Sequence, residues 1–118
     1  MKKIFLIILA TLSFSRAFCQ IKIGIDSVTN HYGDTVTVCS KVYGTKLIAL
    51  SQTIFINLGA AYPNSLLTVV IFSKDRSNFK EAPETLYADK NICVTGLIKE
   101  FNGKPEIIVS KPGDIIIQ

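Results

Sequence analysis

Thr35-Val36-Thr37-Val38-Cys39-Ser40-Lys41-Val42 is a stretch of the chain in which apolar and polar side chains alternate. Its three valines fall on one face of an extended backbone, and Thr37, Cys39 and Lys41 fall on the other. Alternation with a period of two over this length is typical of a half-buried antiparallel strand. Gly44 follows the stretch and is expected to break or bend the strand.

Four further segments carry strand patterns, so the sequence predicts an all-β fold. Residues 53–58 form the second predicted strand, and residues 66–72 are nearly all apolar, as expected for a strand covered on both faces. Residues 91–100 alternate again. Asn102-Gly103 then gives a strong signal for a tight hairpin that leads into the last predicted strand at residues 105–110.

The segment between the third and fourth predicted strands is more polar than the rest of the chain. Ser73 or Asp75 is expected to cap a short helix there, and Pro83 is placed to begin a second helical turn. After the last strand, residues 114–118 form an apolar tail that is expected to dock on the β structure. This segment therefore predicts one short helical connection within an otherwise β domain.

The chain begins with the pattern of an export signal. Lys2 and Lys3 precede an apolar run over residues 4–12, and small residues, Ala17 and Cys19, stand at positions −3 and −1 of a cut before Gln20. The apolar run is well short of the roughly 20 residues that span a bilayer. These features predict a signal-peptide helix that is removed from the mature protein.

The predicted organisation is a signal peptide over residues 1–19 and a single domain over residues 20–118, exported to the periplasm or secreted. Lipid attachment at Cys19 is the alternative. A lipoprotein signal carries a small residue before the cysteine and a leucine near −3, whereas this chain has Phe18 and Arg16 at those places. We therefore expect no stable membrane insertion after cleavage.

Much of the positive charge lies in the predicted signal. The whole chain has 13 Lys and Arg against 9 Asp and Glu, and residues 1–19 hold three of the cations and none of the acids. The mature domain thus has 10 cations against 9 acids, a net charge of +1. Such a domain lacks the strong basic excess of a charge-driven nucleic-acid binder, so long-range steering should be weak.

Catalytic and metal sites find little support in the sequence. The single histidine, His31, lies in a turn, and Cys39 and Cys93 of the mature chain belong to no CxxC pair. The acidic residues are scattered and form no recognisable general acid and base. We expect no metal, no cofactor and no enzymatic activity.

Three strands, a short helical link and two strands joined by a tight hairpin follow the order of an OB-fold, a five-stranded Greek-key barrel. Residues 33–38, 55–58, 94–98 and 103–109 resemble the anticodon-binding type of OB nucleic-acid-binding domain. The resemblance extends over residues 33–115 and implies an exported, stand-alone version of that domain. Asn57 departs from it, because many such domains have an acidic residue there.

The resemblance implies where a ligand lies. OB-folds hold ligands across the second and third strands, framed by the loops after the first and fourth. If Ile54 and Ile56 point inward, Phe55 points outward and can stack on a base; a register error of one residue would instead bury Phe55. Tyr43 and Lys46 are assigned to the first loop. The candidate ligand residues are Lys41, Tyr43, Phe55, Asn57, Tyr62, Phe72, Lys74, Arg76, Phe101 and Lys104.

The same resemblance places Cys39 and Cys93 on the outward side of neighbouring antiparallel strands. A disulfide forms there if the two residues lie directly opposite, and an exported compartment is oxidising enough to keep it. Two buried thiols are the alternative.

The function expected from the resemblance is binding of single-stranded DNA or RNA. The alternative is a non-enzymatic OB-fold that binds an oligosaccharide, a small ligand or a partner protein, and the net charge of +1 favours it. Exposed aromatic side chains and positive charge on the second and third strands would distinguish the nucleic-acid interpretation.

Overall fold

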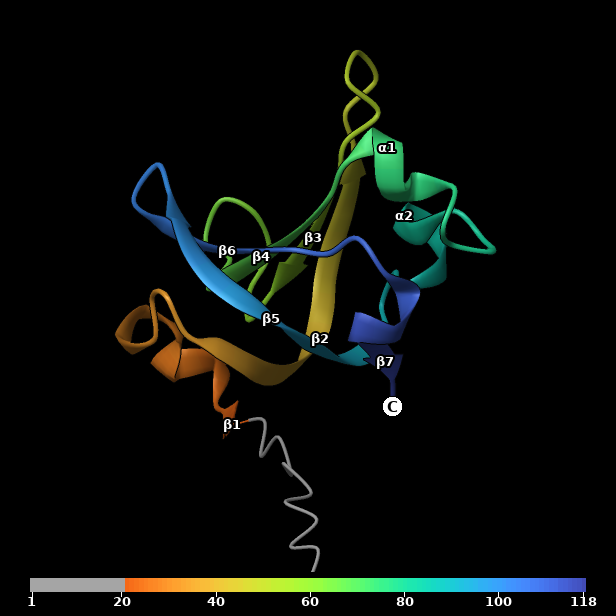
Figure 1. The fold of residues 1–118 in the computed structure, drawn as a ribbon. Helices are drawn as coiled ribbons and strands as arrows, with labels where there is room; N and C mark the ends of the chain where they lie inside the picture. The colour runs from red at the N-terminus through yellow and green to blue at the C-terminus, as the bar shows by residue number, and fades with distance from the viewer. Residues whose placement is uncertain (1–20) are drawn as a thin grey trace, which may run out of the picture.

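Five strands close into a barrel in the computed structural model, which describes residues 21–118 (Figure 1). The predicted signal peptide and the cleavage point at Cys19 and Gln20 lie outside the described residues. The barrel strands are β2 (Thr35–Leu47), β3 (Ile54–Leu58), β4 (Leu67–Ile71), β5 (Asn91–Phe101) and β6 (Lys104–Ile108). Four of the five were predicted within two residues at each end, and β2 extends five residues beyond its predicted end.

The strand pairing is that of an OB-fold. Strands β2, β3 and β4 form an antiparallel meander, β4 pairs in parallel with β6, and β6 pairs with β5 through the predicted hairpin. Antiparallel pairing of β5 with β2 closes the barrel. Asn102 and Gly103 both have positive φ, 50° and 77°, as the two-residue hairpin turn requires.

Two short strands extend the barrel at its edges. β7 (Ile115–Ile117) pairs antiparallel with β5, which is the expected docking of the apolar tail. β1 (Ile21–Ile23) pairs in parallel with β2 and is followed by the 3₁₀ helix η1 (Ile25–Asn30). Neither β1 nor η1 was predicted: the three residues of β1 are too few to show an alternating pattern, and η1 is a six-residue 3₁₀ segment with no apolar periodicity.

The barrel core follows the alternation in the sequence. The valines predicted to face inward on β2 are fully buried, as are the residues predicted to face inward on β3 and β5. Each such side chain contributes about 1.5–3 kcal/mol when it is removed from water. The buried residues of these three strands are Val36, Val38, Val42, Ile54, Ile56, Leu58, Ile92, Val94 and Ile98.

Strand β2 continues through Gly44 instead of ending there. Val42 pairs with Leu58 and Gly44 pairs with Asn57, so Tyr43 is an extra residue that forms a β-bulge. A bulge increases the local twist and redirects side chains. The prediction that Tyr43 and Lys46 lie in a loop was therefore wrong, because the bulge bends the strand without interrupting its pairing with β3.

Two single-turn helices cover one end of the barrel, rather than the one short helix predicted: α1 (Ser73–Arg76) and α2 (Pro83–Leu86) (Figure 1). Phe72 occupies the cap position of α1 and makes no side-chain capping bond, so the expected caps Ser73 and Asp75 lie inside the helix. Pro83 begins α2 as predicted. A further 3₁₀ turn, η2 (Pro112–Asp114), leads into β7.

Aromatic packing holds the helical segment against the core. Phe79 and Tyr87 are buried and meet edge to face, with ring centroids 6.2 Å apart. Burial raises the pKa of the Tyr87 phenol above its ordinary value.

A disulfide joins Cys39 of β2 to Cys93 of β5. The two residues are directly opposite in the ladder, with their Cα atoms 4.0 Å apart. The next outward pair, Thr37 and Thr95, is joined by a hydroxyl hydrogen bond of 2.8 Å. The predicted disulfide is confirmed, and it fastens the strand pair that closes the barrel.

From Ile21 to the C-terminus, the structure contains no helix that is long and apolar enough to cross a membrane.

Candidate ligand-binding groove

A groove of about 690 Å³ lies over the outer face of β3 and β4. One wall is the end of β2, and the other is formed by the β5–β6 hairpin and the loop at residues 59–66. Its volume lies within the range of about 300–1,000 Å³ that is usual for ligand sites. This is the position predicted from the OB-fold resemblance, across the second and third barrel strands.

Aromatic side chains gather in this groove from four separate segments. Tyr43 comes from the bulge of β2, Phe55 from β3, Tyr62 from the loop after β3, and Phe101 from the end of β5. Tyr43, Tyr62 and Phe101 are 47%, 78% and 60% exposed, and Phe55 is half-buried. Side chains this exposed contribute little to the core and leave ring faces available to a ligand.

The direction of Phe55 settles the register question. Ile54, Ile56 and Leu58 are fully buried, so Phe55 and Asn57 lie on the outer face of β3. The alternative that places Phe55 in the core is wrong, because the isoleucines on either side already fill the inner face.

A row of small and polar residues crosses the floor of the groove. Gly44, Asn57, Thr68 and Glu106 are successive cross-strand partners on β2, β3, β4 and β6. The Thr68 hydroxyl donates to Asn57 Oδ1 at 3.4 Å, and Ser65 Oγ lies 3.3 Å from Thr68 Oγ1. A Cβ on Gly44 would lie 4.0 Å from Asn57 Nδ2, at ordinary contact distance, and Asn57 is only 7% exposed although it faces the groove.

Charges of both signs line the groove. Lys46 and Lys104 contribute two cations and Glu106 one carboxylate, which gives the lining a small positive excess. Lys104 Nζ donates to the Pro63 carbonyl at 2.6 Å and joins the hairpin to the loop after β3. Lys41, outside the lining, holds its Nζ 5.6 Å from the Tyr43 ring centroid.

The surroundings of Glu106 in the groove shift the pKa of its carboxyl group. Burial raises the pKa of its carboxyl group, and the positive charge of Lys99, its partner on β5, lowers it to a lesser extent. The carboxylate therefore holds a proton at a higher pH than an ordinary glutamate.

The structure brings together six of the ten predicted ligand residues: Tyr43, Phe55, Asn57, Tyr62, Phe101 and Lys104. Lys41 lies beside them through Tyr43. Phe72, Lys74 and Arg76 do not line the groove, because they belong to the cap and body of α1. Their grouping at the end of the third predicted strand suggested a ligand site. The chain turns into α1 at this point, and the turn separates the three residues from the groove.

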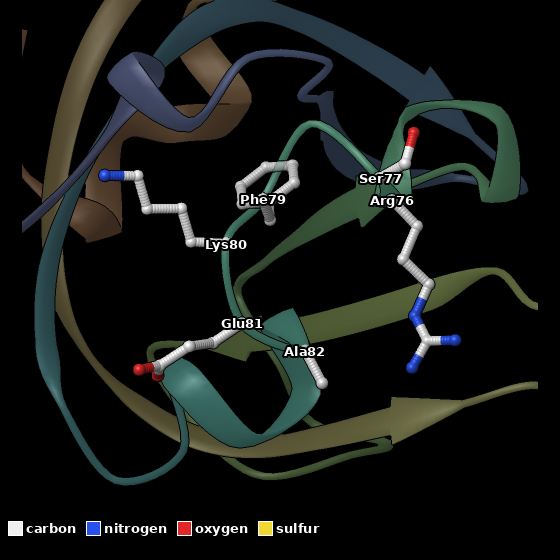
Figure 2. A pocket seen from close by; sticks show the side chains of 6 residues that line it. All are labelled: Arg76, Ser77, Phe79, Lys80, Glu81 and Ala82. Atoms are coloured by element: carbon white, nitrogen blue, oxygen red, sulfur yellow. The ribbon is translucent and has the colours of Figure 1, made fainter.

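Arg76 contributes to a second, shallow hollow of about 410 Å³ along the segment between α1 and α2 (Figure 2). Figure 2 shows its guanidinium directed away from Lys80 and Glu81. The Arg76 guanidinium forms an ion pair with Glu84 and donates to Gln52 Oε1 at 3.2 Å. This hollow therefore offers no set of polar groups converging on one point.

Sequence reasoning missed Thr68 and Glu106. Thr68 is the one polar residue of β4, and its hydroxyl in an otherwise apolar strand is a usable signal for the outer face. Glu106 occupies the outward position between Pro105 and Ile107, both buried. The alternation of β6 could have identified it.

Among residues 21–118, no three His, Cys, Asp or Glu side chains are grouped closely enough to hold a metal ion.

No protein-family model and no curated protein matches the chain. Similar solved structures include asparaginyl-tRNA synthetase from Pyrococcus horikoshii (TM-score 0.56, 16% identity, 81% of this chain and 22% of that one). Yeast Stn1 and Ten1 give a TM-score of 0.57 at 14% identity, over 86% of this chain and 64% of that one. An OBody bound to hen egg-white lysozyme gives 0.55 at 15% identity, over 81% and 91%.

These likenesses show the OB-fold and nothing finer. The chain spans about a fifth of the length of the synthetase and less than two thirds of the Stn1–Ten1 chain.

Proposed function

We propose that this protein is a non-enzymatic OB-fold module that binds single-stranded nucleic acid in the groove over β3 and β4. The observation that carries the proposal is the set of four exposed or half-exposed aromatic rings, Tyr43, Phe55, Tyr62 and Phe101, around one groove. Base stacking on an aromatic side chain contributes roughly 1–3 kcal/mol per base. Stacking of two bases would therefore supply much of the affinity of a micromolar complex.

Single strands suit this groove better than a duplex. Stacking on Phe55 requires a base whose face is free, and bases within a duplex already stack on one another. Lys46 and Lys104 provide cations for the backbone phosphates at the edges of the groove. With two such contacts, the logarithm of affinity should fall with the logarithm of salt with a slope of about −1.4, a weak dependence.

The likeness to a tRNA synthetase agrees with this proposal by analogy of fold. Binding to a partner protein is the second candidate, and one observation favours it. The OBody, whose fold this chain shares, is bound to lysozyme, and tyrosines such as Tyr43 and Tyr62 serve well as protein-contact residues. An oligosaccharide or small ligand would use the same aromatic rings.

Salt-dependent fluorescence anisotropy separates these candidates. The purified protein is titrated into labelled single-stranded DNA, single-stranded RNA and the matching duplex at low and moderate salt. Saturable binding of a single strand with weaker binding of the duplex supports the proposal. Absence of single-strand binding at micromolar protein rejects it in favour of a protein, sugar or small-molecule ligand.

We also propose that the module acts outside the cytoplasm. The signal-like pattern of residues 1–19 and the disulfide between Cys39 and Cys93 support this location, because disulfides persist in oxidising compartments. Mass spectrometry of the protein recovered from each cell fraction tests it. An N-terminus at Gln20 in an exported fraction is expected, and an uncleaved cytoplasmic chain would contradict it.

A further inference from the structure

The connection between β2 and β3, residues 48–53, projects past the barrel beside α1 (Figure 1). We call it the β2–β3 tip. Two backbone bonds fold it: Ile48 N donates to Thr53 O at 2.8 Å, and Gln52 N donates to Ile48 O at 2.7 Å. Leu50 at the tip is fully exposed, whereas Ile48, Gln52 and Thr53 at its base are half-buried.

Gln52 connects the tip to the helical segment through its side chain. Its Oε1 accepts a hydrogen bond from Arg76 Nη1 at 3.2 Å, and its Nε2 donates to the Ala49 carbonyl at 2.9 Å. Both ends of the side-chain amide are therefore engaged, one within the tip and one outside it. The backbone of Gln52 has φ of 56°, in the left-handed region, which these bonds help to maintain.

Arg76 is itself fixed from the other side. Its Nη2 pairs with Glu84 of α2, and the two side chains are only 32% and 18% exposed. The main-chain carbonyl of Glu84 accepts a hydrogen bond of 2.7 Å from Thr45 Oγ1 on β2. β2 and the tip are thus joined to the helical segment at two points, Thr45 through the main chain of Glu84 and Gln52 through the side chain of Arg76.

Thr45 lies within one wall of the groove, and Gln52 lies beyond the end of that wall. Thr45, Lys46 and Ile48 line the groove, whereas Gln52, Arg76 and Glu84 do not. Pairing with β3 fixes this wall as far as Leu47, which pairs with Ile54, whereas Ile48 lies beyond the last cross-strand pair and depends on the fold of the tip. A fixed wall lowers the ordering cost when a ligand binds.

We propose that Gln52 and the Arg76–Glu84 pair are positioning residues that pre-form the β2 wall of the groove without touching the ligand. The inference rests on the proposed function for its effect on affinity, but its effect on the tip itself is independent of any ligand. It also assigns Arg76 a role other than the phosphate contact expected from its charge.

The primary test compares Gln52→Met with Gln52→Glu in the purified protein. Methionine keeps the length of the side chain and loses both bonds, whereas glutamate keeps the acceptor for Arg76. We expect Gln52→Met to weaken binding of a labelled single strand about fivefold and Gln52→Glu to stay within about twofold of the native protein. Equal affinity for all three proteins would overturn the inference.

Amide hydrogen exchange measures directly how well the hydrogen bonds of the β2–β3 tip are maintained. In Gln52→Met the amides of Ile48 and Gln52 should exchange faster, while amides of the barrel core keep their protection. Unchanged exchange in the tip would overturn the inference, whether or not the native protein binds nucleic acid. If the native protein binds no strand at all, the proposed function fails and this measurement alone decides the positioning role.

The double variant Arg76→Gln/Glu84→Gln tests whether Arg76 contacts the ligand. Replacing both partners leaves no unpaired charge and so preserves folding better than either single change. A positioning role predicts weaker binding with an unchanged salt dependence. A direct phosphate contact would instead reduce the salt slope by about 0.7, and that result would overturn the inference.

Discussion

Lys46 and Phe55 are direct cross-strand partners on the outer face of β2 and β3, and both line the groove. Directly opposite residues have Cβ atoms about 4.5–5.5 Å apart, so a cation stands beside an aromatic ring. A nucleotide stacked on Phe55 would bring its phosphate within reach of Lys46. The bulge at Tyr43 sets this pairing, because it shifts the register of β2 by one residue beyond Val42.

Phe55→Ala should weaken single-strand binding by about 1–3 kcal/mol, or about 5- to 150-fold, because it removes the stacking surface in the centre of the groove. Fluorescence anisotropy measures the loss. Phe72→Ala is the matched control, since Phe72 is 38% exposed and lies outside the groove. Equal effects of the two changes would show that the groove is not the binding site.

Lys46→Ala should lower both the affinity for a single strand and its salt dependence. Loss of one phosphate contact reduces the slope of log affinity against log salt by about 0.7. Titrations at several salt concentrations measure the slope, and Lys74→Ala on α1 serves as the control. The account is wrong here if Lys74→Ala reduces the slope as much as Lys46→Ala.

Binding of an anionic strand should strengthen as the pH falls through the raised pKa of Glu106. Burial holds the proton on this carboxyl group to a higher pH than usual, and protonation removes the only negative charge among the residues that line the groove. The facing charges are Lys99 across the ladder and Lys46 and Lys104 in the lining. Glu106→Gln should bind more tightly at neutral pH and show a flatter pH profile; an unchanged profile would contradict the assignment.

The same group affects stability with a defined sign. The pKa of Glu106 is higher in the folded chain than in the unfolded chain, so protonation of this carboxyl group favours the folded state. Its contribution to the free energy of unfolding has its full value at any pH below the pKa of the unfolded chain. That contribution disappears as the pH rises through the folded value. Denaturant melts of native protein and Glu106→Gln should therefore converge at low pH, and divergence there would refute the sign.

Removing the disulfide should destabilise the fold without weakening ligand binding. Cys39 and Cys93 close a separation of 54 residues and lie outside the groove. The double change Cys39→Ala/Cys93→Ala should cost about 2–4 kcal/mol and lower the melting temperature by roughly 10 °C or more. Thermal melts and anisotropy measure the two effects, and a large loss of affinity in the still-folded variant would contradict this separation.

The barrel could be predicted from the sequence because its strands obey a simple rule. Alternating valines placed one face of β2 in the core, and Asn102-Gly103 fixed the hairpin through its requirement for positive φ. Short elements without an alternating pattern, such as β1 and η1, left no such signal. Their positions depend on pairing with β2, which is a tertiary contact.

The groove was predicted less completely, for two physical reasons. Phe55 was found because it alternates with isoleucines that point inward, and the other aromatic residues were found because they fall in predicted loops or the hairpin. The bulge at Tyr43 left no such signal, because it depends on the register between two strands. Arg76 was assigned to the ligand because it follows the third predicted strand together with Phe72 and Lys74. Its partner Glu84 lies on another helix, so only the fold brings the two together.

The central claim is that the face carrying Phe55 holds single-stranded nucleic acid. The most direct measurement is anisotropy of a labelled single strand titrated with native protein and with Phe55→Ala, in parallel with a duplex of the same sequence. The account predicts saturable micromolar binding of the single strand, weaker binding of the duplex and a large loss in Phe55→Ala. No binding of the single strand by native protein at micromolar concentration and low salt would contradict it.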